Sequence, residues 1–89
     1  MAGGPPAGFG SQVWSGGRYE GEVLDGEPHG RGVLILDRLR YEGEFRNGKP
    51  NGIGTLFRGS ESFRGVWADG CFREGTRKIS FGVPLSACP

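Results

Sequence analysis

The sequence lacks the long apolar runs and the charge excess that mark membrane-spanning or nucleic-acid-binding chains. Its longest apolar stretch is VLIL at residues 33–36, far shorter than the roughly 20 residues that a transmembrane helix needs. The formal net charge is only +1, from 11 basic and 10 acidic side chains, so the chain has no general attraction to nucleic acid. We therefore expect no spanning helix and no nucleic-acid partner.

Cysteine and histidine are also scarce. The chain holds two cysteines, Cys71 and Cys88, and one histidine, His29. Two cysteines form neither a disulfide framework nor a zinc cluster, so we expect free thiols in a reducing compartment, with no metal and no cofactor. The N-terminus shows no signal-peptide pattern, and we expect a soluble, cytoplasmic protein.

Glycine is abundant instead, at 19 of 89 residues, and it recurs with a fixed period. RYEGEVLDGEPHGRGVLIL begins at Arg18, RYEGEFRNGKPNGIGTLF at Arg40 and SFRGVWADGCFREGT at Ser62, each 22 residues after the last. Gly8 and Gly10 lie one period before Gly30 and Gly32. The chain therefore begins with half a repeat and continues with three further repeats, the last of which departs from the pattern.

Each repeat has the signature of a β-hairpin, because an Asp-Gly or Asn-Gly dipeptide favours the type I′ turn. The three dipeptides are Asp25-Gly26, Asn47-Gly48 and Asp69-Gly70. A two-residue turn fixes the register of the strands on either side. In the first hairpin the predicted pairs are Tyr19 with Gly32, Gly21 with Gly30 and Val23 with Pro28. In the second they are Tyr41 with Gly54, Gly43 with Gly52 and Phe45 with Pro50. In the third they are Phe63 with Thr76 and Trp67 with Phe72.

These pairings give the repeated glycines a structural role. They would clear space for an aromatic ring to lie across the neighbouring strand, since glycine inside a strand often marks such a close approach. The structural glycines are Gly21, Gly30, Gly32, Gly43, Gly52 and Gly54. The paired carboxylates Glu20/Glu22 and Glu42/Glu44 would lie on the opposite, solvated face.

The repeats YEGEVLDGEPHGRGVL and YEGEFRNGKPNGIGTL resemble the MORN repeat, in which an aromatic-Glu-Gly-Glu strand, a short turn and a Gly-x-Gly strand follow one another. The resemblance implies an all-β fold, a single-layer twisted antiparallel β-meander of about three tandem hairpins. We expect a flexible N-terminus at residues 1–7 and a sheet at residues 8–76, divided into a half repeat 8–17 and repeats 18–39, 40–61 and 62–76. The tail, residues 77–89, would add one strand over residues 78–83 or fold back on the aromatic face.

No enzyme site emerges from the sequence. GEFRNGKP at residues 43–50 approaches a phosphate-binding loop, but Pro50 stands where that loop needs a hydroxyl and the segment lies between two strands. Cys71 has no base near it in the repeat, so it lacks what a nucleophile requires. By resemblance, members of the family are mostly scaffolds and adaptors at the cytoskeleton, in cilia or beside membranes. We therefore expect a non-enzymatic adaptor.

The aromatic side of the sheet is the predicted interaction surface. A single-layer sheet has nothing behind its apolar strip unless the chain itself, a protein partner or a second copy covers it. The predicted partner-binding residues are Tyr19, Tyr41, Phe45, Phe63 and Trp67. The alternative function is binding of phospholipid head groups through basic residues such as Arg73, Arg77 and Lys78, which we do not favour because no dense basic cluster occurs.

Overall fold

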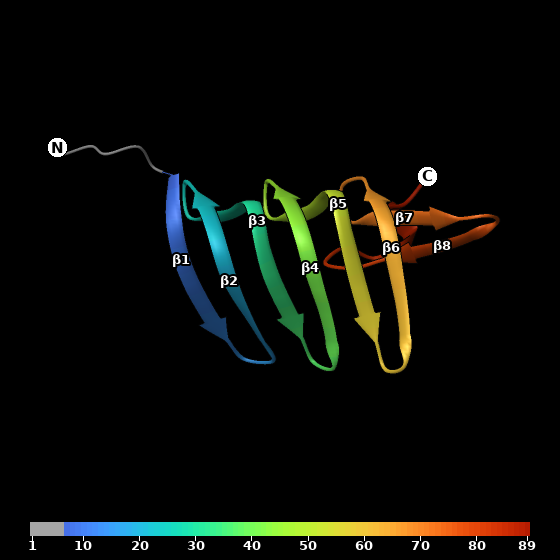
Figure 1. Ribbon diagram of the computed structural model, residues 1–89, viewed down its shortest axis with the longest axis horizontal. Helices are drawn as coiled ribbons and strands as arrows, with labels where there is room; N and C mark the ends of the chain where they lie inside the picture. The colour runs from blue at the N-terminus through green and yellow to red at the C-terminus, as the bar shows by residue number, and fades with distance from the viewer. Residues whose placement is uncertain (1–6) are drawn as a thin grey trace, which may run out of the picture.

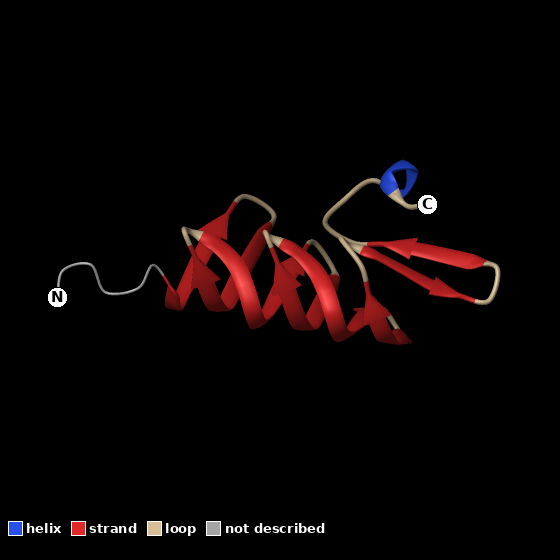
Figure 2. Ribbon diagram, turned by 90° about the horizontal axis from the view of Figure 1, so that it is seen from above, coloured by secondary structure: helices blue, strands red, loops and turns tan. Residues whose placement is uncertain are grey.

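The computed structural model describes residues 7–89, and the predicted flexible segment 1–7 lies almost wholly outside them (Figure 1). The fold is all-β, as the sequence predicts. Six strands form one antiparallel sheet in chain order. They are β1 (Ala7–Trp14), β2 (Gly17–Leu24), β3 (Glu27–Leu36), β4 (Leu39–Arg46), β5 (Lys49–Arg58) and β6 (Glu61–Trp67). Figure 2 shows them following one another as a coiled ribbon rather than a flat layer.

The predicted turns form for the predicted reason. Asp25, Asn47 and Asp69 have φ angles of 53°, 53° and 51°, and a glycine with positive φ follows each of them. Type I′ turns require positive φ at both central residues, which Asn, Asp and Gly tolerate best. These dipeptides therefore fix where each repeat reverses direction.

The predicted register is correct only beside the turns. Val23 pairs with Pro28, but further along β2 Tyr19 pairs with Leu34, and Gly21 with Gly32. A bulge causes this shift, because three residues of β3 lie opposite a single residue of β2. The second hairpin repeats it. The predicted pairs Tyr19–Gly32, Gly21–Gly30, Tyr41–Gly54 and Gly43–Gly52 are therefore wrong. The shift is two residues, so every side chain keeps its predicted face.

Two glutamates stabilise the bulges. Glu22 Oε1 accepts a hydrogen bond from the Arg31 backbone N–H at 2.5 Å, and Glu44 Oε1 accepts one from the Ile53 N–H at 2.7 Å. Gly30, at the first bulge, has a φ of 90°, which a side chain rarely tolerates. The second glutamate of each YEGE segment thus has a structural role on its exposed side of the sheet, which the sequence analysis did not assign to it.

The third repeat does not complete its hairpin in the sheet. After an isolated bridge between Ala68 and Cys71, the chain leaves the sheet as β7 (Cys71–Glu74), which pairs with β8 (Arg77–Ser80). The predicted pairs Phe63–Thr76 and Trp67–Phe72 are therefore wrong. The reason is visible in the sequence, since Glu74 and Thr76 replace the two glycines that earlier repeats use in the returning strand.

The β7–β8 hairpin closes the end of the sheet. In the second repeat the backbone of Gly54 lies beside Gly43, whereas in the third the ring of Phe72 lies beside Gly65 in the corresponding place. Beyond β8, Phe81 donates its N–H to the Gly70 carbonyl at 2.9 Å, which holds the tail against the turn. The tail therefore both adds a strand, outside the six-stranded sheet, and folds back on the aromatic face.

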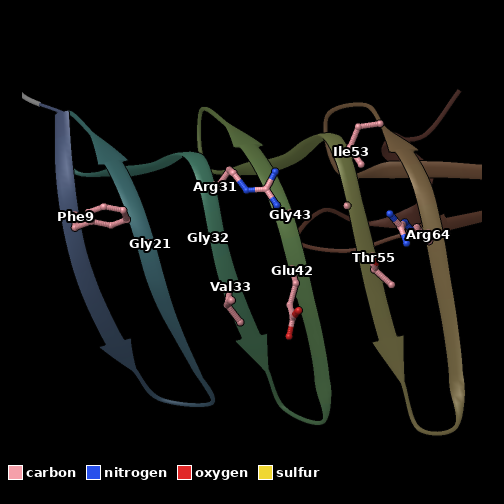
Figure 3. A pocket seen from close by; sticks show the side chains of 11 residues that line it. Phe9, Gly21, Arg31, Gly32, Val33, Glu42, Gly43, Ile53, Thr55 and Arg64 are labelled. Carbon is pink, nitrogen blue, oxygen red and sulfur yellow. The ribbon is translucent and has the colours of Figure 1, made fainter.

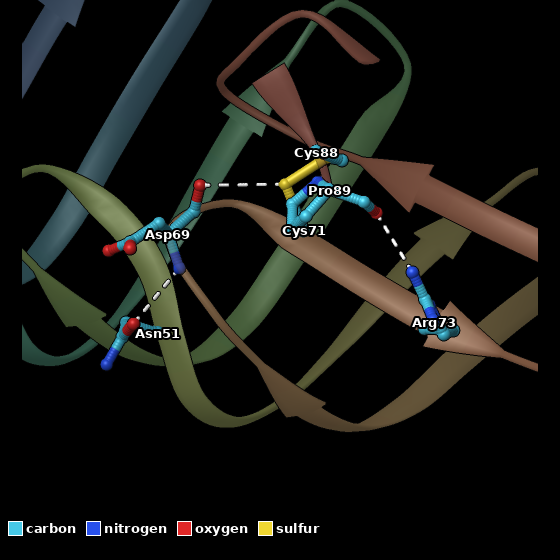
Figure 4. The surroundings of a disulfide bond; sticks show 6 residues. All are labelled: Asn51, Asp69, Cys71, Arg73, Cys88 and Pro89. Carbon is cyan, nitrogen blue, oxygen red and sulfur yellow. Dashed lines mark hydrogen bonds between the residues drawn. A yellow bond between two sulfur atoms is a disulfide. The ribbon is translucent and has the colours of Figure 1, made fainter. Parts of the chain in front are cut away.

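A disulfide joins Cys71 to Cys88, so the prediction of free thiols is wrong (Figure 4). The Cα atoms are 5.6 Å apart, within the range that a disulfide spans. A short 3-10 helix, η1 (Leu85–Ala87), leads into Cys88, and the Arg73 guanidinium donates to the Pro89 carbonyl at 2.9 Å. The argument for a reducing compartment depended on free thiols and no longer holds, so the cytoplasmic location stays a prediction.

The core lies on one side of the sheet and extends into the C-terminal segment. Its buried side chains are Tyr19, Leu34, Tyr41, Phe45, Leu56, Phe63, Trp67, Phe72, Ile79 and Phe81. The last three come from β7, β8 and the residue after β8. Across residues 7–89, no helix has both the length and the apolar character needed to cross a membrane.

Candidate functional site

The five predicted partner-binding aromatics form the core of the fold. Their relative exposures range from 0% to 3%. Phe45 forms T-shaped pairs with Tyr19 and Tyr41 at centroid distances of 5.1 and 5.0 Å, and Tyr41 forms another with Trp67 at 5.4 Å. These are favourable edge-to-face arrangements. In this conformation Phe63 and the other four rings do not line an open groove, and their role in partner binding stays a prediction.

The C-terminal segment covers part of this face. The Phe81 ring stacks on Tyr41 at 6.4 Å, and the Phe72 ring stacks on Trp67 at 5.1 Å. Two guanidiniums, of Arg58 and Arg77, lie over the Phe63 ring at 5.1 and 5.2 Å, where they gain cation–π attraction. Self-coverage, which the sequence left open as an alternative, therefore accounts for the aromatic side over β4 to β6.

The two tyrosines are positioned by their hydroxyls as well as by their rings. Tyr19 Oη donates to the Glu22 carbonyl at 2.6 Å, and Tyr41 Oη donates to the Glu44 carbonyl at 2.9 Å. Burial raises the pKa of both phenols to about 12, because the buried site disfavours the charged form. Each tyrosine thus ties its ring to the bulge of its own repeat.

We expect the tyrosines to ionise well above the ordinary pKa of about 10. A phenol whose folded-state pKa is raised contributes stability that is fully present below pH 10 and is lost as the pH rises from about 10 to about 12. Tyrosinate absorbance, measured during an alkaline titration, reports only Tyr19 and Tyr41, since the chain has 2 tyrosines. Tyr41→Phe should remove half of the signal. Complete ionisation by pH 10 in the folded chain would contradict the burial of both hydroxyls.

The opposite side of the sheet is open and contains a row of glycines. Each strand of the sheet contributes one glycine to this row, and glycines on neighbouring strands are directly paired. The row runs from Gly10 on β1 through Gly21, Gly32, Gly43 and Gly54 to Gly65 on β6. A side chain at any of these positions would point to the aromatic side, so on the open side the row is a floor of bare backbone that crosses all six strands between the side chains of the flanking residues. We call the hollow above this floor the trough.

Side chains from both sides of the glycine row form the walls of the trough, whose volume is about 450 Å³ (Figure 3). One wall carries Phe9, Arg31 and Ile53. The other carries Val33, Glu42, Thr55 and Arg64. In Figure 3 the guanidiniums of Arg31 and Arg64 both reach over the floor, from β3 and β6.

The acidic groups beside the trough already have partners. Glu20 and Glu42 pair with Arg18 and Arg40 at 3.7 and 3.1 Å, while the carboxylates of the two bulge glutamates accept backbone N–H groups. Among the described residues, neither Arg31 nor Arg64 forms an ion pair within 4.0 Å. The bulge glutamates bond only neutral N–H groups and keep their negative charges, and Glu44 is directly paired with Arg31 across β3 and β4, so acidic and basic groups are mixed around the trough.

An apolar pair adjoins Arg64. Ile53 and Val66 are directly paired across β5 and β6 and are 50% and 67% exposed. Val66 stands where the earlier repeats have the bulge-stabilising glutamate, and Arg64 stands where they have Glu20 and Glu42. Without a returning strand to form a bulge, the third repeat needs no such glutamate, and both positions are available for another use.

Sequence reasoning did not find this surface. The signal was present, since Arg64 and Val66 replace the two glutamates of the YEGE strand, but in the sequence they look only like part of an atypical last repeat. The residues with reactive or metal-binding side chains do not form a further site in the part of the chain that the structure describes. His29 lies on β3, and no group of three or more His, Cys, Asp or Glu side chains among the described residues could hold a metal ion.

The comparison with protein families agrees with this geometry. A family model of the MORN repeat matches residues 19–37 and residues 41–60. Each matched segment begins at the tyrosine of a YEGE strand and includes the turn and the returning strand with its bulge. No curated protein matches the chain at a significant level.

Proposed function

The chain is a MORN-repeat protein, and we propose that it is a non-enzymatic adaptor that binds a segment of a protein partner along the open side of its sheet. Repeats of this family support interactions with proteins or membranes, and the family is generally non-enzymatic. The trough is the observation that supports the proposal, because it is a recessed surface lined by residues from all six strands of the sheet. Binding surfaces of repeat proteins are typically extended in this way.

The aromatic side of the sheet is filled by the chain's own side chains, which pack behind the floor of the trough. Tyr19 and Tyr41 fill the back of the glycine row, since a Cβ added at Gly32 or Gly54 would overlap their rings. The two rings thus pack directly against the backbone that forms the floor of the trough. We keep a protein partner as the favoured occupant and place the adaptor in the cytoplasm, at the cytoskeleton or in a cilium, as the family resemblance implies.

Lipid binding through the predicted basic residues is less well supported. Arg73 donates to the Pro89 carbonyl, and Arg77 lies over Phe63 and pairs with Glu61 at 3.6 Å. Of the three residues in that segment, only Lys78 has no such engagement among the described residues. Recognition of anionic lipid usually requires clusters of about four to eight basic residues, so this segment offers too little.

Panning the intact, disulfide-bonded chain against a random peptide display library tests the adaptor. We expect enriched peptides whose binding is weakened at least tenfold by Thr55→Trp, which places a large ring in the trough. Leu85→Trp is the matched control, since Leu85 is 53% exposed on η1, outside the trough, and it should leave binding unchanged. The proposal fails if no peptide is enriched, or if both variants lose binding equally.

A further inference from the structure

We propose that the chain associates with a second copy of itself through the outer edge of β1, so that one continuous antiparallel sheet takes six strands from each copy. The inference goes beyond the proposed adaptor function and does not depend on it. It is carried by the unprotected edge of β1 and by the match between the side chains of this strand and those of a second β1.

The outer edge of β1 has no partner strand among the described residues (Figure 1). Edge strands of natural sheets are normally shielded by charged side chains, by proline or by a bulge. β1 has none of these, since AGFGSQVW contains no charged residue and no proline, and its eight residues pair with β2 without a bulge. Each of the other five strands of the sheet contains at least two charged residues. The edge of β1 is therefore open to another strand.

The exposed side chains of β1 match a second copy of the same strand. Phe9 and Val13 are 83% and 75% exposed, and no other large apolar side chain among the described residues is as exposed. They lie on the open side of the sheet, two residues before and two residues after Ser11. An antiparallel pair of β1 strands with its two-fold axis at Ser11 therefore places Phe9 of each copy opposite Val13 of the other. Aromatic and β-branched side chains stabilise each other in such cross-strand pairs, and this match of β1 with itself favours a second copy over a strand from another protein.

The other end of the sheet is closed, so the association stops at two copies. Beside β6, the ring of Phe72 lies against Gly65, in the place where a continuing repeat would put the backbone of its next strand. Ala68 and Cys71 exchange backbone hydrogen bonds of 2.8 and 2.9 Å at the point where the chain leaves the sheet. A head-to-tail contact between β6 and the β1 of another copy would therefore have to displace the β7–β8 hairpin.

Pairing of two identical edges gives a closed, two-fold arrangement instead of a filament. Its axis is perpendicular to the sheet, because paired residues of antiparallel strands have their side chains on the same face. The troughs of both copies therefore lie on the same side of the continuous sheet.

Sedimentation equilibrium of the intact chain tests the inference. We expect the mass to rise with concentration from one chain of 9.5 kDa to two chains and no further, up to about 1 mM, where even weak complexes are populated. Phe9→Lys should weaken the association at least tenfold, because it places a charge opposite Val13 of the other copy. The fold should tolerate this change, since Phe9 is exposed and is paired with Glu22 on β2. Val66→Lys is the matched control, because Val66 is 67% exposed on β6, and it should alter the association less than twofold.

A cross-link at the two-fold axis tests the register. In the proposed pairing the Ser11 residues of the two copies lie directly opposite each other, with Cα atoms about 4.5–5.5 Å apart, which a disulfide spans. With oxidised glutathione as the oxidant, two Ser11→Cys thiols would form one disulfide and release two molecules of reduced glutathione. We expect the covalent dimer to form at least tenfold faster in Ser11→Cys than in Val66→Cys, as measured on non-reducing gels.

Each other result overturns the proposal in a distinguishable way. A mass that stays at 9.5 kDa up to about 1 mM would leave the edge of β1 to a strand from another protein. A mass that rises beyond two chains would show that the β6 end also pairs. Equal effects of Phe9→Lys and Val66→Lys, or equal cross-linking rates of Ser11→Cys and Val66→Cys, would show that the copies meet at a different surface.

Discussion

Replacing Trp67 by alanine is expected to lower the free energy of unfolding by about 3–5 kcal/mol, the range for deleting a large buried aromatic side chain. Trp67 is only 1% exposed. Its Nε1–H donates to the Gly54 carbonyl at 3.2 Å, its ring meets Tyr41 at 5.4 Å, and it stacks on Phe72 at 5.1 Å. One side chain therefore connects β6 with β5, β4 and the C-terminal hairpin.

The loss should be large relative to the whole stability of the fold. At about 0.05–0.15 kcal/mol per residue, a domain of this size has roughly 4–13 kcal/mol in total. Removing Trp67 leaves a cavity between the sheet and the β7–β8 hairpin, whose backbone pairs with the chain leaving β6 only through the isolated bridge between Ala68 and Cys71. We expect the hairpin to detach before the sheet unfolds.

Urea denaturation followed by far-ultraviolet circular dichroism measures this effect. Val66→Ala is the control on the same strand, because Val66 is 67% exposed and should change stability by less than about 0.5 kcal/mol. Trp67→Phe should fall between the two variants, since it keeps a ring but removes the hydrogen bond to Gly54. A loss below about 1 kcal/mol for Trp67→Ala would mean that the hairpin does not depend on this contact.

The repeat made most of the fold predictable from the sequence. The period locates the turns at Asp25, Asn47 and Asp69, and the alternation of side chains assigns Tyr19 and Tyr41 to the apolar side. Both inferences depend only on local backbone preferences and on the two-residue period of a strand. The structure agrees with both, because neither depends on contacts between distant parts of the chain.

The register could not be predicted from the turns alone. A bulge exchanges regular ladder hydrogen bonds for side-chain ones, and here the exchange depends on Glu22 and Glu44, which accept the Arg31 and Ile53 N–H groups. In the sequence these glutamates look like ordinary solvated residues of an alternating strand. Their periodic recurrence was the available signal, but periodicity does not distinguish a solvated carboxylate from one that binds the backbone.

The position of the C-terminal segment could not be predicted, because its contacts are with residues that lie far away in the sequence. The repeat ends near residue 70, and nothing in the period shows that Phe72 and Phe81 return to the aromatic core or that Cys88 reaches Cys71. The trough could not be predicted either, for a related reason. In the sequence, a departure from a repeat looks like a loss of the repeat pattern. Only the structure shows that Arg64 and Arg31 both line the trough.

Replacing Gly54 by valine is expected to lower the free energy of unfolding by about 1–3 kcal/mol, as overpacking of a core does. Gly54 is buried, and a Cβ at this position would overlap the ring of Tyr41. The ring has little room to move aside, because the Phe45 and Trp67 rings pack against it at centroid distances of 5.0 and 5.4 Å.

Gly8→Val is the matched control for this substitution. Gly8 lies in β1 at the edge of the same sheet, and a Cβ there would meet no atom within 4 Å. It receives the same side chain in the same secondary structure, so it corrects for the loss of backbone freedom that glycine brings to the unfolded state. We expect it to change stability by less than about 0.5 kcal/mol.

A double-mutant cycle with Tyr41→Ala identifies the cause. If Gly54→Val destabilises the fold because its side chain displaces the Tyr41 ring, then the substitution should cost clearly less once that ring is gone, with a coupling of at least about 1 kcal/mol. Thermal or urea unfolding of the four chains gives the coupling directly. Additive losses, or a Gly54→Val chain as stable as the parent, would show that the tyrosine ring does not need the glycine beneath it.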